Sequence, residues 1–190
     1  MASRSSLEAS TVVVVEGVSD RVALETLAER RGRDLAAEGV AVVPIGGAQA
    51  IGGFLRRLER DTRLAGLCDA REERAFARAL ERAGLGSTLT REAMERLGFF
   101  VCDADLEDEL IRALGATTIE DVLAAHGDLG PFRTLQRQPQ WRGRPAEEQL
   151  RRFMGSGGSR KIKYARLLVE ALDLTRVPRP LDRLLAHVSG

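Results

Sequence analysis

Cysteine and histidine are scarce in this sequence of 190 residues. It contains two cysteines, Cys68 and Cys102, and two histidines, His126 and His187. A small disulfide scaffold uses many cysteines, and a structural zinc site needs four cysteine or histidine ligands in a local pattern. We therefore expect neither a disulfide nor a zinc site. Both cysteines, each directly before an aspartate, are predicted to pack as small buried hydrophobes in a reducing compartment.

Long apolar runs are missing as well. No stretch approaches the ~18 residues of a membrane span, and residues 1–10, MASRSSLEAS, lack the apolar core of a signal peptide. With 44% hydrophobic residues the chain is nevertheless globular, and its length suits one domain with a helical appendage. We expect a cytoplasmic protein with no membrane partner.

Lysine is the rarest cation, because the 29 basic residues include only Lys161 and Lys163. Arginine is the cation used elsewhere in the chain, so two ammonium groups in one place indicate a role as a compact point charge that binds a phosphate. Chance clustering is the alternative. The net charge of +1 also hides an uneven distribution, since residues 133–166 contain ten basic and two acidic residues, so that this segment is +8 and the remainder about −7.

Short apolar runs that end in an acid are the most informative pattern present. Residues 12–15 precede Glu16, residues 64–68 precede Asp69, and residues 99–102 precede Asp103. Such runs are typical of strands buried on both faces of a parallel sheet, whose carboxyl ends share one edge. The acids are therefore predicted to converge, and a cation such as Mg²⁺ or Mn²⁺ would relieve their repulsion.

The alternation of strands and amphipathic helices predicts an α/β fold with a mostly parallel four-stranded sheet flanked by helices. We expect strands at 11–15, 40–45, 64–68 and 99–102, and helices at 20–31, after Gly46-Gly47, and at 72–83, 91–97, 106–114 and 118–126. Residues 127–145 are rich in proline and glycine and are predicted to form a loop. Helices at 146–154, 160–172 and 181–187 follow, with a glycine-serine linker at 155–159.

The order of these elements resembles the TOPRIM domain, the metal-binding module of primases, topoisomerases, small nucleases and OLD-family endonucleases. Glu16-Gly17 matches its strand-end glutamate turn, and Asp69 matches the first aspartate of its Asp-x-Asp motif, but Arg71 stands at the second. That departure removes one metal ligand. Either the following pair Glu72-Glu73 compensates, or Asp103-Ala104-Asp105 supplies the spacing.

Two further features resemble the OLD branch, namely Asp20 and the acidic run at residues 105–110, DLEDEL. The resemblance implies a Rossmann-like TOPRIM fold over residues 11–130, after a flexible N-terminus at 1–10. Residues 131–190 would then form a basic loop and a C-terminal helical extension that packs on the core. OLD proteins carry an ABC-type ATPase domain ahead of this module, and this sequence shows none. The resemblance therefore also implies a separate ATPase as a partner.

The same resemblance implies a site with two metal ions. Glu16, Asp20 and Asp69 would hold one ion. Asp105 and Glu107 would help to hold the second. Two ions ~4 Å apart stabilise the attacking and leaving oxygens of an in-line phosphodiester displacement. Lys161 or Lys163 would neutralise the developing charge, Glu16 could instead act as a general acid or base, and water would be the nucleophile.

The basic segment is predicted to contact the phosphate backbone of DNA or RNA without reading its sequence. The candidate contacts are Arg137, Arg142, Arg144, Arg151, Arg152 and Arg160, with Arg133 nearby. Trp141 lies among them and either stacks on a base or anchors a loop on the core, in which case the arginines form a solvated face.

Together these features predict Mg²⁺-dependent phosphodiester hydrolysis by an OLD-like nuclease acting on DNA. A catalytically degenerate module that binds nucleic acid or a separate ABC-type ATPase is the alternative, because of Arg71. A small-molecule phosphatase or nucleotidyl transferase could use the same acids, but a small substrate needs no long positive track.

Overall fold

A four-stranded parallel sheet forms the centre of the computed structural model, which describes residues 9–58 and 62–189. Its strands are β1 (Thr11–Val15), β2 (Val40–Pro44), β3 (Arg63–Asp69) and β4 (Phe99–Cys102), in the order β2-β1-β3-β4. Every pairing is parallel. The predicted fold class is confirmed, and the ends of β1, β3 and β4 lie along one edge. The N-terminus predicted as flexible lies, up to residue 8, outside the described residues.

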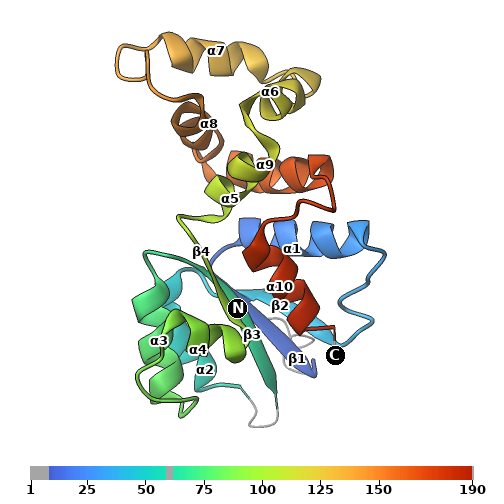
Figure 1. Ribbon diagram of the computed structural model, residues 1–190, viewed down its shortest axis with the longest axis vertical. Coiled ribbons are helices and arrows are strands. Elements are labelled where there is room, and N and C mark those ends of the chain that lie inside the picture. Colours follow the sequence, from blue (N-terminus) through green and yellow to red (C-terminus); the bar gives the residue numbers. More distant parts are fainter. Residues whose placement is uncertain (1–8, 59–61, 190) are drawn as a thin grey trace.

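Helices cover both faces of the sheet because alternate strand residues point to opposite sides. Val13 and Val15 face α1 (Val18–Arg30) and α10 (Arg179–His187). Val12 and Val14 face the other layer, which consists of η2 (Ala48–Ala50), α2 (Ile51–Leu55), α3 (Glu73–Arg82) and α4 (Arg91–Arg96). The strand residues are therefore buried on both faces, and α10 returns the end of the chain to the sheet (Figure 1).

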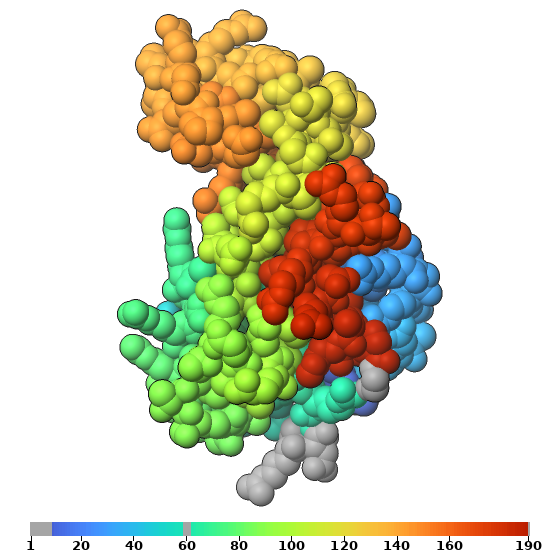
Figure 2. All heavy atoms as spheres, in the orientation of Figure 1, coloured from blue at the N-terminus to red at the C-terminus, as the bar shows by residue number. Residues whose placement is uncertain are grey.

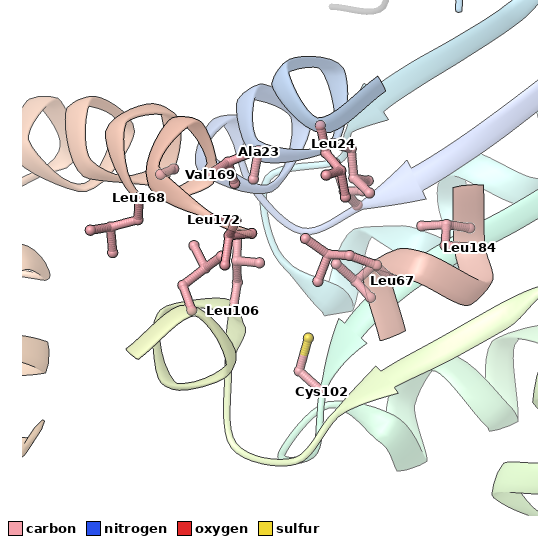
Figure 3. Packing of buried hydrophobic residues seen from close by; sticks show 14 of the residues in the cluster. Ala23, Leu24, Leu67, Cys102, Leu106, Leu168, Val169, Leu172 and Leu184 are labelled. Atoms are coloured by element: carbon pink, nitrogen blue, oxygen red, sulfur yellow. The ribbon is translucent and has the colours of Figure 1, made fainter. Parts of the chain in front are cut away.

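Five helices continue beyond the carboxyl edge of the sheet. They are α5 (Leu106–Leu114), α6 (Ala116–Ala125), α7 (Leu129–Arg137), α8 (Ala146–Met154) and α9 (Gly158–Ala171). Helix α9 packs along α1, and Figure 3 shows Ala23 and Leu24 of α1 in one apolar cluster with Leu168 and Val169 of α9. One core thus joins the sheet to these helices, while α6, α7 and α8 project away from it (Figures 1 and 2).

The prediction of a loop at residues 127–145 is wrong, because α7 occupies residues 129–137. Pro131 lies in the first turn of this helix, where a backbone N–H would have no intrahelical partner to lose. Phe132 follows it and is fully buried. The predicted linker is also shorter than expected, since α9 begins at Gly158. The other predicted helices are present, with ends shifted by a few residues.

Within the described ranges, no helix is both long and apolar enough to cross a lipid bilayer.

Candidate active site at the carboxyl edge of the sheet

Glu16 and Asp20 are held by backbone groups at the end of β1. Glu16 follows the strand, is partly buried, and accepts a hydrogen bond from the Asp69 N–H at 3.0 Å. This bond ties the end of β1 to the end of β3. Asp20 lies in the first turn of α1, as expected, and its Oδ2 accepts from the Gly17 N–H at 2.8 Å. Both acids therefore have fixed positions beside Asp69.

Asp69 ends β3 in a strongly negative environment. Burial, followed by the charges of Glu16, Asp20 and Asp105, raises the pKa of Asp69 to about 8. Burial is also the main cause that raises the pKa of Glu16 and of Asp20. A carboxyl whose pKa is raised by three other carboxyls must lie close to them. Acids from β1, α1, β3 and α5 are thus brought together at one edge.

Helix α5 contributes Asp105 and Glu107. Asp105 is the N-cap and accepts from the Asp108 N–H at 2.9 Å. Glu107 is only 8% exposed, and burial raises its pKa. Its Oε1 lies 3.3 Å from Lys161 Nζ, in an ion pair whose geometry leaves that buried oxygen without a hydrogen bond from the described residues.

The two lysines, which the sequence did not distinguish, lie in different surroundings. Burial alone would lower the pKa of Lys161, but the charges of Glu107, Asp20 and Asp69 raise it above its ordinary value. Lys163 instead lies 2.7 Å from Asp128, which also accepts a hydrogen bond from the Tyr164 hydroxyl at 2.6 Å. Lys161 therefore faces the acids, whereas Lys163 belongs to a separate cluster.

Asp105 has a cationic partner that sequence analysis missed. Arg151 on α8 donates from Nε to Asp105 Oδ2 at 2.9 Å and makes a second contact through Nη2. The two residues are 46 positions apart, so no local pattern links them. Arg151, predicted as a nucleic-acid contact, is thus engaged within the acidic edge.

The acids that could replace the missing aspartate have different positions. Glu72 lies near enough for its charge to raise the pKa of Glu16, after burial and Asp20. Glu73 pairs with Arg91 at 2.7 Å, and Asp103 is exposed and pairs with the same arginine at 3.4 Å. Of the alternatives, only Glu72 and Asp105 therefore face the acidic edge.

The donor chemistry of this edge fits a hard divalent cation, because its ligands are carboxylates alone and they repel one another. As the side chains stand, however, no three Asp, Glu, His or Cys residues of the described part of the chain are placed to hold one ion. Ligation by three of the acids therefore requires side-chain rotation.

Most arginines of the predicted basic segment already have partners. Arg133 pairs with Glu120 at 2.7 Å, and Arg144 pairs with Glu148 at 3.4 Å and lies over the Trp141 ring. Further contacts hold Arg142 to the Arg137 carbonyl at 3.2 Å and Arg160 to Ser156 Oγ at 2.6 Å. Arg137 and Arg152 are exposed, and Arg152 lines an open groove with Trp141 and Arg151.

Comparison with known proteins identifies the fold. Residues 8–63 match the model of the TOPRIM domain of overcoming lysogenization defect (OLD) protein-like sequences. The structure resembles the C-terminal region of the Xanthomonas campestris pv. campestris OLD protein with 23% identity and a TM-score of 0.74, over 95% of this chain and 92% of that one. The C-terminal region of the Burkholderia pseudomallei OLD protein gives 20% identity and a TM-score of 0.68, over 95% and 96%.

A search of curated protein sequences found no match. At these identities the solved structures establish the shared fold, and the match at residues 8–63 covers β1, α1 and β2 with Glu16 and Asp20. Residues 8–63 thus match an OLD-like TOPRIM domain, and the chain shares its fold over nearly its whole length with the C-terminal regions of OLD proteins.

Proposed function

We propose that the chain is a metal-dependent phosphodiesterase that hydrolyses nucleic acid, with DNA as its substrate. The observation that carries this proposal is the group of mutually repelling acids at the carboxyl edge, with Lys161 beside them. Such a group is unfavourable without a cation, and phosphate chemistry uses this combination of carboxylates and an ammonium. The OLD-like TOPRIM match supports a nuclease-related function.

In this proposal Glu16, Asp20 and Asp69 hold one Mg²⁺ or Mn²⁺, and Asp105 and Glu107 help to hold a second. Bound ions of this kind polarise phosphoryl oxygens and make a coordinated water a better nucleophile. Backbone contacts of the protein hold three of these acids near one another. Backbone N–H groups orient Glu16 and Asp20, while the N-cap geometry of α5 orients Asp105.

Lys161 is the proposed phosphate-facing cation. The acids that raise its pKa keep it protonated at neutral pH, so it can neutralise charge that develops on the phosphoryl oxygens. Lys163, which pairs with Asp128, is assigned a structural role instead.

Water is the proposed nucleophile, and not Tyr164. The Tyr164 ring is buried, its hydroxyl donates to Asp128, and burial together with this bond raises its pKa. A phenol in that state is a poor nucleophile. The proposal is therefore hydrolysis without a covalent protein–DNA intermediate.

Cleavage of supercoiled plasmid and of single-stranded DNA with Mg²⁺ or Mn²⁺ tests this function. Glu16→Gln keeps the size of the side chain and should abolish cutting. Glu25→Gln is the matched control, because Glu25 lies on α1 and pairs with Arg21 at 3.8 Å, away from the acids. Cutting that survives in Glu16→Gln, or that needs no divalent metal, would contradict the proposal.

A second candidate is a degenerate TOPRIM module that binds nucleic acid or a separate ABC-type ATPase. Arg71 favours it, because this residue stands where the family motif has its second aspartate. In that case the wild-type protein would bind DNA or an ATPase but neither bind Mn²⁺ nor cut DNA.

A further inference from the structure

A groove between α2 and α3 carries a dense set of arginines that the site described above does not use. It is lined by η2, α2 and α3, and we call it the α3 groove. Its charged residues are five arginines and one glutamate, namely Arg56, Arg71, Arg74, Arg78, Arg82 and Glu72. The groove is therefore strongly positive, although α3 as a sequence segment is not.

These five arginines are exposed, and no carboxylate among residues 9–58 and 62–189 forms an ion pair with any of them. The Arg56 guanidinium lies over a glycine pair instead, since a Cβ placed on Gly52 or Gly53 would be 3.8 Å from its nitrogens. Like charges gathered on one surface repel each other, so this arrangement does not stabilise the fold by pairing. As far as the described residues go, the guanidinium groups are therefore available to an anion.

The spacing of the arginines along α3 suits contacts with the phosphates of one nucleic-acid strand. Arg74, Arg78 and Arg82 recur every four residues, on the side of α3 away from the buried Phe76 and Leu80. They are about 6 Å apart along the helix axis, so the stripe is about 12 Å long. One strand of a duplex carries a charge every ~3.4 Å along its axis, so the stripe spans about three or four phosphates.

The groove begins at the acidic edge. Arg71 follows Asp69 by two residues, and Glu72, which lines the groove, lies near enough for its charge to act on Glu16. The backbone also connects them, because the Gly46 N–H donates to the Glu16 carbonyl at 3.0 Å just before η2. A polymer held at the acids can therefore continue along α3.

We propose that the α3 groove binds the sugar-phosphate backbone of the nucleic acid on one side of the bond to be cut. Arg74, Arg78 and Arg82 contact phosphates of one strand, with about one arginine for every two phosphates. Arg71 contacts the phosphate next to the acids. Guanidinium groups bind phosphate in a bidentate manner, with no need to read base sequence. This inference rests on the proposed function and adds a substrate surface outside the predicted basic segment.

The test is binding of a fluorescein-labelled DNA duplex in EDTA, followed by anisotropy over a range of NaCl concentrations. Arg74→Gln/Arg78→Gln is compared with Arg96→Gln/Arg183→Gln, which neutralises two exposed arginines on a different surface. We expect the first variant to lose roughly tenfold in affinity and its log–log salt slope to fall by about 2, because each phosphate contact contributes ~0.9. The control should bind like wild type.

Both variants should keep the wild-type unfolding temperature, since neither loses an ion pair with a residue that the structure describes. Equal affinities and salt slopes for the two variants would overturn the inference. The groove would then face solvent or an acidic protein surface instead of nucleic acid. Cleavage of the same duplex with Mn²⁺ separates the two proposals. If wild type cuts but Arg74→Gln/Arg78→Gln binds normally, the groove fails and the nuclease stands; if nothing cuts but binding weakens as expected, the reverse holds.

Discussion

The arginines around α8 and those of α3 differ in whether an acid lies beside them. Arg133, Arg144 and Arg151 each pair with a carboxylate, and the last of these pairs within the acidic edge itself. Arg74 and Arg78 have no such partner among the described residues. Paired guanidinium groups hold helices in place, whereas unpaired ones are available to a ligand.

Charge counted along the sequence is therefore a poor guide to a binding surface. Residues 133–166 have a charge of +8, yet much of it is neutralised by acids elsewhere in the fold. In α3 the acids are interleaved with the arginines, but Glu73 turns to Arg91 and Glu81 accepts from the Leu89 N–H. In the described part of the chain, each of these acids thus has a partner other than the arginines of the groove.

The largest effect on the cleavage rate should come from replacing Lys161, a cation that is paired with an acid. Lys161→Ala leaves the buried Glu107 without its cation and removes the proposed charge on the phosphate. We expect cleavage to fall by about 100-fold or more, the usual loss for one electrostatic contact in a transition state. Lys163→Ala, the matched control, should change the rate less than about twofold. Equal losses of activity in both variants would contradict a catalytic role that belongs to Lys161 and not to Lys163.

A smaller effect, on stability, should come from the acids that Lys161 faces. Asp69 has a folded pKa of about 8 against an ordinary value of 3.8. The folded state therefore keeps a proton that the unfolded state has released, so the stability of the metal-free protein should fall as pH rises from about 4 to 8. Asp69→Asn removes this penalty.

Thermal unfolding in EDTA measures that penalty. Asp69→Asn should unfold at a higher temperature than wild type at pH 8, by about 2–4 °C for each 1 kcal/mol relieved, and by less at pH 5. Added Mn²⁺ should raise the midpoint of wild type more than that of the variant. A gain that is the same at pH 5 and pH 8 would show that repulsion at Asp69 is not its cause.

The smallest effect contrasts two arginines directly. Arg151→Gln loses the pairing with Asp105, whose side chain is 18% exposed, and should lower the free energy of unfolding by about 1 kcal/mol. Arg78→Gln should leave it unchanged. Urea denaturation of the two variants checks this, and equal midpoints would remove the distinction between paired and unpaired arginines.

The sequence predicts the sheet and its acids because both depend on short-range patterns. The run before Glu16 is continuous and β-branched, so β1 and the position of the acid at its end follow directly. Asp69 is found by the same reasoning, whereas Asp105 and Glu107 follow from the resemblance of residues 105–110 to the OLD branch. Their convergence follows from the parallel topology, which the alternation of strands and helices predicts.

The remaining features depend on long-range contacts or on the position of a residue within an element. Pro131 by itself indicates a loop, but it lies in a first turn that tolerates proline. The pairing of Arg151 with Asp105 joins residues 46 positions apart. The stripe on α3 was visible in the spacing of Arg74, Arg78 and Arg82, but a count of net charge hides it.

Whether the acids at the carboxyl edge bind a metal ion is decided by isothermal titration calorimetry of the metal-free protein with Mn²⁺. We expect wild type to bind one or two ions, Glu16→Gln to lose at least about tenfold in affinity through its lost ligand, and Glu25→Gln to bind normally. Absence of binding to wild type, or equal affinities in all three proteins, would contradict a metal site at the carboxyl edge.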